Sequence, residues 1–463
     1  WQLPALLTAA AFLGGCASFS PDGGFAPVQQ TAKDRLGKDL QWARSDADRD
    51  AIDLRVRELL SKPLSVDDAV QIALLNNRGL QAEYQELGIG EADLVQAGRL
   101  PNPGVAFART TQGGEVELEW LLAINLARLI AIPLFMEVES RRFAHTQLRV
   151  SLQMVSLAAD TRKAWLNAVA AEETVRYMRQ VMQAAEASAE LARRMQQVGN
   201  FNKLQRAREQ GFYADAALNL ARAEQAQRAT RERLTRLLGL WGAQAQFSLP
   251  ERLPDLPKST VDLPDIERLA LEQRLDVRGA KLAAEQTAKN LGLTRTTRFI
   301  NVLEVGAIYN TYNDAPSQRG YEIGFELPLF DWGDARVAKA EAIYMQAVDR
   351  AAQTAIDARS EVREAYTGYR SAYDIARHHR DEIVPVRQRI AEENRLRYNG
   401  MLIVVLELLA DSRDQVNSVM AALNAEQQFW LADAALQASL IGKPTSAGIS
   451  GGGAAAAEAG AGY

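Results

Sequence analysis

The sequence predicts a mainly α-helical protein with a small β part, built as a tandem repeat with long coiled-coil-like helices and four strands. Three observations predict this fold class: markers that occur twice in the same order, long stretches without proline, and four short segments that alternate apolar and polar residues. The composition fits a packed protein, because 47% of the residues are hydrophobic. The net charge of −5 argues against nucleic acid as a partner, which a basic surface would favour.

The chain opens with the apolar stretch "LPALLTAAAFLGG", which is followed by Cys16, the single cysteine. Residues 3–13 have the length of the apolar region of a secretory signal and are too short to span a bilayer. The order "LGGC" resembles the lipobox of bacterial lipoproteins, so Cys16 is expected to become the acylated N-terminus. In that class of lipoproteins an Asp directly after the cysteine suggests retention in the inner membrane, so the resemblance, with Ala17 at this position, implies the outer membrane. A buried structural thiol is the alternative for Cys16.

Four markers recur at an offset of about 200 residues, which predicts a duplication. "ALLNNRGLQA" matches "ALEQRLDVRGA", "PLF" occurs twice, glycine turns lie near Gly199 and Gly400, and "LLG" or "LIG" closes each half. The predicted parts are a signal peptide with a truncated start (1–15), a lipid-anchored segment (16–63), a first repeat (64–240), a proline-rich connector (241–264), a second repeat (265–442) and a low-complexity tail (443–463).

Each repeat is predicted to run helix, two strands, long helix, turn, helix. Residues 137–197 contain no proline, and their apolar residues recur at the spacing of a coiled coil. In the second repeat a stripe steps by 4, 3, 4 and 3 residues through Val362, Tyr366, Tyr369, Tyr373 and Ala376. Such a narrow seam is typical of helices packed side by side. Core packing is favoured over a ligand ladder for the tyrosines.

Four segments alternate with period two, as strands with one buried face do. "VELEWLLAINL" places on one face Val116, Leu118, Trp120, Leu122, Ile124 and Leu126. The other face carries mainly polar or small residues, Glu117, Glu119, Ala123 and Asn125. "YEIGFELPLF", "NVLEVGAIYN" and the weaker "GVAFART" follow the same design, with polar turns expected at 111–115 and 312–320.

This alternation fits either a soluble sheet on a core or a membrane barrel with lipid outside and water within. Length favours the barrel, because tilted strands need ~9–11 residues to cross a bilayer. Four strands are too few to close a barrel, and open edges are not tolerated in hydrocarbon. The chain is therefore expected to share a barrel among three copies, which gives twelve strands. An acidic lumen would then be lined by Glu117, Glu119, Glu304, Glu322 and Glu326.

Residues 64–442 resemble the TolC-like outer-membrane efflux factor family. The resemblance rests on "LSVDDAVQIALLNNRGLQA", the two "PLF" segments, the two glycine turns, the repeat architecture and the lipobox. It implies a homotrimer with a twelve-stranded β-barrel in the outer membrane, continuous with a long α-helical barrel in the periplasm. It also implies passive conduction of substrates, with a periplasmic adaptor and an inner-membrane pump as partners.

The two glycine turns are the candidate adaptor-contacting tips. Gly199 and Gly400 interrupt long helices where the chain reverses, a place that suits a residue tolerant of φ > 0. In the resembling family these hairpins form the periplasmic tips, and the contact candidates here are Val198, Gly199, Asn200, Phe201, Tyr398, Asn399, Gly400, Met401 and Leu402. Phe201, Met401 and Leu402 are expected to be exposed. A helix C-cap with hydrophobic staples is the alternative.

The resembling family often closes its periplasmic end with acidic residues six and nine positions after the second glycine turn. This chain has Leu406 and Leu409 there, so a hydrophobic constriction is expected in place of an acidic gate. Glu407, Asp411 and Asp414 are spaced 4 and 3 residues apart and share one helical face. They form either acidic rings in a trimer or a solvated outer face.

Two other classes of function compete with a channel. Catalysis is disfavoured, because His145, His378 and His379 fall in predicted helices without the spacing of a known site, and "GIGEAD" lacks the third glycine of a dinucleotide motif. A lipid-anchored periplasmic coiled-coil scaffold would explain the helices and Cys16, but not the four alternating strands. We expect no cofactor or metal site. The exported substrate and the identity of the pump are not readable from the sequence.

Overall fold

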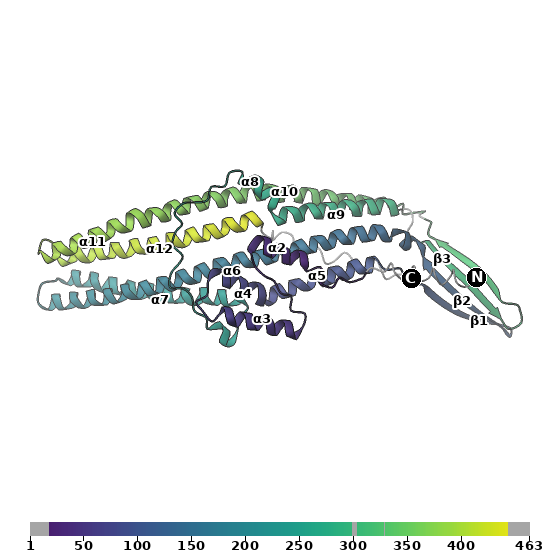
Figure 1. The fold of residues 1–463 in the computed structure, drawn as a ribbon, viewed down its shortest axis with the longest axis horizontal. Helices are drawn as coiled ribbons and strands as arrows, with labels where there is room; N and C mark the ends of the chain where they lie inside the picture. The colour runs from purple at the N-terminus through teal and green to yellow at the C-terminus, as the bar shows by residue number, and fades with distance from the viewer. Residues whose placement is uncertain (1–17, 299–302, 328, 443–463) are drawn as a thin grey trace. The chain divides into compact units, whose positions relative to one another are not determined.

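The computed structural model describes residues 18–298, 303–327 and 329–442, which form helices and one four-stranded sheet (Figure 1). The mainly α-helical fold with a small β part, predicted from the sequence, is confirmed. Among the described residues, no helix is both long and apolar enough to cross a membrane. Residues 1–15, Cys16 and the tail at 443–463 lie outside the described part of the chain.

The helices and strands follow the order expected for each repeat, with the helix before the strands divided in two. The N-terminal segment and first repeat contain α2 (Ala26–Leu36), α3 (Asp46–Leu59), α4 (Val66–Asn76), α5 (Arg78–Ala97), β1 (Gly104–Gln112), β2 (Glu115–Asn125), α6 (Leu126–Gln197) and α7 (Lys203–Leu238). The connector and second repeat contain η1 (Gly242–Ala245), α8 (Ile266–Gln273), α9 (Leu275–Thr297), β3 (Leu303–Tyr312), β4 (Gln318–Phe325), α10 (Asp334–His378), η2 (His379–Ile383), α11 (Val384–Asn399) and α12 (Val405–Ile441).

The chain divides into two compact units, and each takes segments from both repeats. Unit 1 comprises Trp1–Gln30, Glu83–Ser151 and Leu275–Ile356 and contains the whole sheet. Unit 2 comprises Thr31–Ala82, Leu152–Arg274 and Asp357–Tyr463 and contains both long helical hairpins. Because these units cut across the repeats, the domain boundaries read from the sequence stay a prediction.

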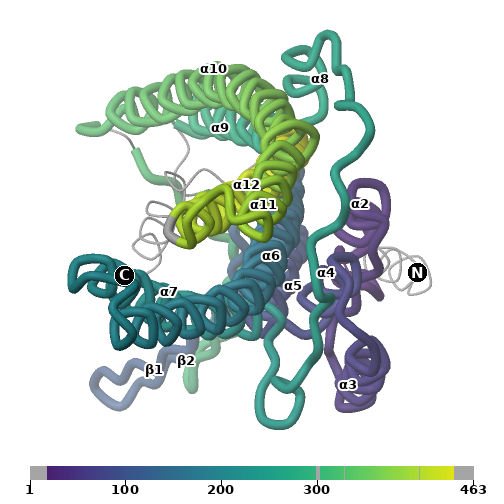
Figure 2. The backbone as a smooth tube through the Cα atoms, turned by 90° about the vertical axis from the view of Figure 1, so that its left-hand side faces the viewer, coloured from purple at the N-terminus to yellow at the C-terminus, as the bar shows by residue number. Residues whose placement is uncertain are grey.

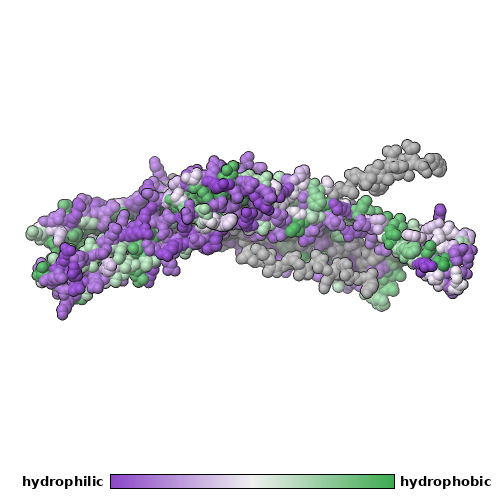
Figure 3. Space-filling view, turned by 90° about the horizontal axis from the view of Figure 1, so that it is seen from below, coloured by the Kyte–Doolittle hydropathy of each residue, from purple (hydrophilic) through white to green (hydrophobic). Residues whose placement is uncertain are grey.

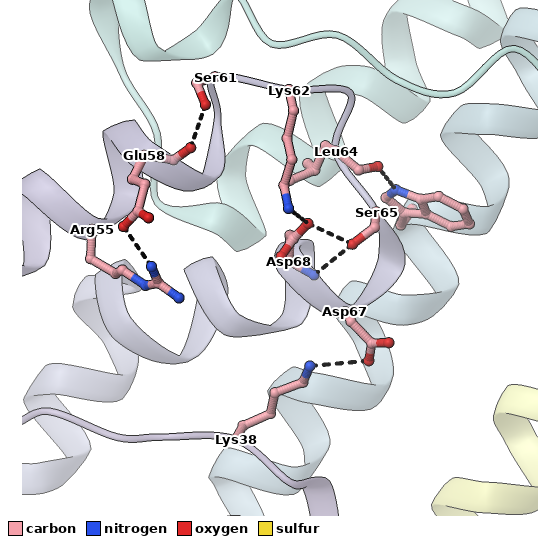
Figure 4. Close-up of polar contacts among 10 residues, drawn as sticks. Lys38, Arg55, Glu58, Ser61, Lys62, Leu64, Ser65, Asp67 and Asp68 are labelled. Carbon is pink, nitrogen blue, oxygen red and sulfur yellow. Dashed lines mark hydrogen bonds and ion pairs between the residues drawn. The ribbon is translucent and has the colours of Figure 1, made fainter.

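The start of α4 is fixed by a cap and by a tryptophan from α6 (Figure 4). The Ser65 hydroxyl accepts a hydrogen bond from the backbone N–H of Asp68 at 3.1 Å, and Lys62 lies 3.4 Å from the Asp68 carboxylate. The indole of Trp165 donates to the carbonyl oxygen of Leu64 at 2.8 Å. Both partners of this last bond are buried in the largest hydrophobic cluster, so the cap of α4 is tied directly to the core.

In each repeat, a side chain at the junction of the two short helices forms a hydrogen bond with the end of that repeat's last helix. Between α4 and α5, the Asn77 amide donates to the Leu237 carbonyl oxygen of α7 at 2.9 Å. Between α8 and α9, Arg274 donates to the Ser439 carbonyl oxygen of α12 at 3.1 Å and pairs with Glu361 at 2.8 Å. Carbonyls in the last turn of a helix lack helical partners. A side chain from the start of each repeat therefore satisfies carbonyls at its end.

Helix α6 begins directly where β2 ends, which corrects the predicted strand face. Asn125 accepts a hydrogen bond from the backbone N–H of Arg128 at 2.8 Å, so its side chain caps the new helix. Leu126 is consequently the first residue of α6, and Pro133 lies inside this helix. In the second repeat Pro328 of the matching "PLF" lies outside the described residues.

The long helices pack in pairs, α6 with α7 and α11 with α12 (Figure 2). Helix α6 runs without interruption to its turn, whereas the matching stretch of the second repeat contains the π-helical segment η2. There the N–H of Val384 donates to the carbonyl oxygen of His379, five residues back. Pro385 follows immediately and has no N–H to offer, so the regular helical bond is lost at this point.

The four strands form one antiparallel sheet in the order β1-β2-β3-β4. A two-residue turn, Gly113–Gly114, joins β1 to β2, and both glycines have positive φ. Residues 313–317 join β3 to β4, so both turns are shorter than expected from the sequence. Within the described part of a single copy, strands β1 and β4 each have one edge without a partner strand.

Candidate functional site

The register of the sheet separates its side chains into an apolar face and an acidic face. Directly opposed residues in antiparallel strands share a face, and Phe107, Trp120, Tyr309 and Arg319 are successive partners across all four strands. The neighbouring row toward the helices consists of Val105, Leu122, Ala307 and Tyr321. The apolar faces predicted for the individual strands thus lie on one side of a single sheet.

The acidic face carries four of the five predicted lumen residues, Glu117, Glu119, Glu304 and Glu322. Around them the face is mostly small or polar, with glycines at 104, 306, 320 and 324. The Glu117 carboxylate accepts hydrogen bonds from the Asn310 amide at 2.9 Å and the Tyr312 hydroxyl at 2.8 Å. The fifth residue, Glu326, follows the last residue of β4 and is not part of the sheet.

The apolar face is exposed in the single chain. The side chains that remain accessible there include Val105, Phe107, Trp120, Leu122, Ile124, Val305, Tyr321, Ile323 and Phe325. Hydrophobic surface also gathers where the strands join the helices, at the right of Figure 3. A contiguous exposed apolar surface of this kind marks a contact with a partner or with lipid.

The turn between α6 and α7 is a helical hairpin whose two helix ends are both capped. Gly199 has φ +81°, and the N–H groups of Asn200 and Gly199 donate to the carbonyls of Met195 and Gln196 at 2.8 and 3.1 Å, the Schellman pattern. Asn202 then caps α7 in a reciprocal capping box with Gln205. These bonds satisfy backbone groups at both helix ends.

The turn between α11 and α12 has the same backbone bonds with different residues. The N–H groups of Leu402 and Met401 donate to the carbonyls of Arg397 and Tyr398 at 2.8 and 2.9 Å. The left-handed residue is Met401, with φ +59°, whereas Gly400 has φ −81°. The prediction that Gly400 supplies the positive φ is therefore wrong, because the helix continues one residue further before the chain reverses.

The two tips differ in what they expose. Phe201 was expected at the surface, yet it is only 7% exposed, because it packs on Ala192 and Val405. Met401 and Leu402 are 92% and 77% exposed, as expected. Val198 is also exposed in the first turn, and Val404 in the second. The remaining candidates Asn200, Tyr398 and Asn399 are also exposed.

The constriction candidates on α12 fall in different environments. Leu409 packs against the cluster around Phe201, and the side chain of Leu406 is not described. The Asp411 carboxylate accepts a hydrogen bond from Asn394 of α11, and Asp414 pairs with Arg387 of α11 at 3.3 Å. Glu407 is exposed. Two of the three acidic residues thus contact the neighbouring helix, and the constriction itself stays a prediction.

A buried ion pair joins the two hairpins and was missed by the sequence reading. Glu209 of α7 is 2% exposed, and its carboxylate accepts hydrogen bonds from Ser188 of α6 at 2.6 Å and from Arg413 of α12 at 2.5 Å. The Arg413 guanidinium also lies 4.7 Å from the centre of the Phe212 ring. The signal was present, because Glu209, Ala216 and Ala223 are buried at intervals of seven residues.

A second charged cluster lines a cavity beside η2. The charged residues that line it are Glu426 of α12, Glu173 of α6, Asp255 and Arg252 of the connector, and Arg380 of η2. Burial raises the pKa of Glu426 to about 7, and the nearby charges of Glu173 and Asp255 add to this effect. Burial likewise raises the pKa of Glu173. Among the described residues, no group of three His, Cys, Asp or Glu is placed to hold a metal.

Residues 267–442 match the family model described as outer membrane efflux protein. This match confirms the resemblance to the TolC-like outer-membrane efflux factor family that the sequence indicated. No curated protein matches the sequence.

Several solved structures share the fold of this chain. They include the Campylobacter jejuni CmeC outer membrane channel, with a TM-score of 0.70 and 16% identity over 81% of this chain and 85% of that one. The Neisseria gonorrhoeae MtrE outer membrane channel, in its open state, has a TM-score of 0.67 and 18% identity, with coverages of 81% and 89%. The outer membrane protein VceC of Vibrio cholerae has a TM-score of 0.64 and 16% identity, with coverages of 87% and 98%.

These names describe two membrane channels and an outer membrane protein, in agreement with the prediction that the chain is not an enzyme. At such low identities the likeness shows the fold alone.

Proposed function

We propose that this efflux protein is the outer-membrane channel of a tripartite efflux or secretion system. In this role it passively conducts substrates from a periplasmic adaptor and an inner-membrane pump to the outside. The observation that carries the proposal is the sheet, in which one face is apolar and exposed, the other is acidic, and both edges are unpaired. The family match over residues 267–442 supports it independently.

The unpaired edges support a homotrimer. Open sheet edges are not tolerated in hydrocarbon, so β4 of one copy would pair with β1 of the next. Three copies of four strands give twelve strands, an even number within the range of known barrels. The apolar face would then contact lipid, while Glu117, Glu119, Glu304 and Glu322 would line a water-filled lumen.

The turn between α11 and α12 is the better candidate for adaptor contact. Its Met401, Leu402 and Val404 side chains are all largely exposed, although exposed apolar clusters are unfavourable in water. A partner that covers them would gain from burying this apolar area. Acylation of Cys16 would in addition anchor the N-terminus in the outer membrane, with the helical hairpins in the periplasm.

The first experiment is reconstitution of the full chain in planar bilayers, together with single-particle imaging in detergent. We expect threefold particles and cation-selective conductance. Substitution of all four strand glutamates by glutamine should reduce that selectivity, whereas Glu364→Gln on the surface of α10 should leave it unchanged. Monomeric particles that do not conduct would favour the alternative, a lipid-anchored periplasmic coiled-coil scaffold.

The adaptor contact is tested by introducing a charged side chain at the α11–α12 turn and, in a control variant, on the surface of α7. Leu402→Glu should lower export and weaken cross-linking to the adaptor, because it introduces a carboxylate into the apolar contact. Leu218→Glu on the exposed surface of α7 is the matched control. Equal loss of export in both variants, or no loss in either, would contradict a specific role for this tip.

A further inference from the structure

The positive charges of the sheet are confined to one face and one end. Arg109 of β1 and Arg319 of β4 are the two basic residues of the four strands. Both lie on the apolar face, whereas Glu117, Glu119, Glu304 and Glu322 lie on the opposite face. Among the described residues neither guanidinium has a carboxylate partner, so both are left with free hydrogen-bond donors.

The level of these arginines along the strands coincides with a row of aromatic rings. Arg319 is the last member of the row Phe107, Trp120 and Tyr309, and its guanidinium lies 5.7 Å from the centre of the Tyr309 ring. The rings of Phe107 and Trp120 are 4.7 Å apart. Arg109 lies two residues nearer the β1–β2 turn. Aromatic rows of this kind occur where a membrane protein leaves the hydrocarbon and meets lipid headgroups.

Arginines on a lipid-facing surface are tolerated near the headgroups and costly at the bilayer centre. Arg319 is the second residue of β4, and Arg109 lies three residues before the end of β1. Both strands are edge strands. If β4 of one copy pairs with β1 of the next, each seam of the barrel carries one Arg319 and one Arg109 on its outer surface, close to the turns.

We propose that Arg109 and Arg319 bind the phosphate of an outer-leaflet lipid at each seam between copies. The inference rests on the proposed trimeric barrel and deepens it by naming a ligand of its outer surface. A guanidinium offers paired donors that match a phosphate, and the apolar rows below it accommodate acyl chains. Charge complementarity thus selects a phosphorylated lipid over a neutral one.

The test uses native mass spectrometry of the full chain in detergent, titrated with lipid A that carries both phosphates and with the same lipid after removal of its phosphates. The wild type should bind the phosphorylated form about tenfold more tightly or better, as expected for charge-assisted hydrogen bonds. The R109Q/R319Q variant should lose this preference. R109K/R319K should retain part of it, and R278Q/R350Q, with the same charge change on α9 and α10, should retain all of it.

Three results would overturn the inference: equal affinity of the wild type for both lipids, an unchanged preference in R109Q/R319Q, or displacement of lipid A by an equal concentration of inorganic phosphate. Conductance of the same samples separates the two proposals. Wild type that neither forms trimers nor conducts contradicts the channel itself. Wild type and R109Q/R319Q that both conduct, without any lipid preference, contradict the lipid site alone.

Discussion

The two helical turns of this chain have the same backbone hydrogen bonds and opposite side-chain chemistry. Both close with the Schellman pattern, from Asn200 to Met195 in the first and from Leu402 to Arg397 in the second. The first turn has glycine at the left-handed position, a side-chain cap on the next helix and a buried aromatic anchor. The second has methionine at that position, and Val404 provides no side-chain cap to α12.

This difference indicates that the two turns meet different requirements. A methionine in the left-handed region costs about 1–2 kcal/mol relative to glycine, and an uncapped helix start forfeits about 1 kcal/mol. The second turn thus gives up stability and keeps apolar side chains in water. Strain and exposure together are typical of a surface shaped by a partner. We therefore expect the first turn to act as a support and the second as a contact.

The largest expected difference concerns the aromatic anchor. Phe201→Ala should destabilise the tips by about 3–4 kcal/mol, because it removes a buried ring from the cluster with Ala192 and Val405. Leu402→Ala, one residue past the left-handed position of the other turn, should change stability by less than about 0.5 kcal/mol. Amide hydrogen exchange at the tips of the full chain measures both. Similar losses of stability in the two variants would contradict the proposal that the first turn acts as a support and the second as a contact.

Exchange of the left-handed residues should have a smaller effect. Gly199→Ala should cost about 1 kcal/mol through the backbone alone, because no atom lies within 4 Å of the added methyl group. Met401→Gly should stabilise the second turn by about the same amount. Gly400→Ala is the control and should be nearly neutral, since its φ is negative and the added methyl group makes ordinary contacts. Thermal unfolding of the full chain would check the three signs, and a costly Gly400→Ala would contradict the assigned turn.

The sequence predicted the sheet well, because the information that defines it is local. Alternation with period two assigns each side chain to a face, and the register then aligns the four apolar faces without further input. The ends of elements were read less well. Asn125 caps α6 immediately after β2, so Leu126 is helical, and a cap next to a strand pattern leaves little trace in apolar periodicity.

The tips were harder to predict, because their burial depends on residues far away in the chain. Phe201 is covered by Val405, more than 200 positions later, so its apolar character alone could not show whether it is buried. The same holds for Arg274, which meets Ser439 and Glu361. Glu209 is the exception, since its position in the heptad of α7 identifies a charge on the buried seam.

Exchange of the helix caps should alter stability by about 1 kcal/mol in opposite directions. Asn202→Ala removes the side-chain oxygen that accepts from the Gln205 N–H at the start of α7, leaves only the bond from its own backbone N–H to the Gln205 side chain, and should destabilise the helix. Val404→Asn should give α12 the side-chain acceptor that it lacks and should stabilise it. Circular dichroism during thermal unfolding provides the measurement. If export falls in Val404→Asn while stability rises, the second turn trades stability for contact, as argued above; unchanged export would limit the contact to Met401 and Leu402.

The helices that lead to the two turns also differ. Helix α6 is continuous, whereas the matching stretch of the second repeat is interrupted at η2, beside Glu426. This difference predicts the smallest effect. The pKa of Glu426 is about 7 in the folded chain, above the usual value of 4.5, so the folded state binds more protons between these values. The contribution of Glu426 to the free energy of unfolding should therefore be largest below pH 4.5 and fall as the pH rises to about 7. The loss should be about 1 kcal/mol, because the carboxyl is only partly removed from water.

Glu426→Gln should remove this dependence and make the protein more stable than the wild type at pH 8, with little difference at pH 4. Glu393→Gln on the exposed surface of α11 carries the same change in charge and should leave the slope intact. The midpoint of thermal unfolding, measured every half pH unit for the three proteins, distinguishes them. Parallel curves for wild type and Glu426→Gln would show that the Glu426 carboxyl does not cause the pH dependence of stability, and would contradict the prediction. A flattened curve for the variant would make the second helical hairpin the pH-sensitive one of the two.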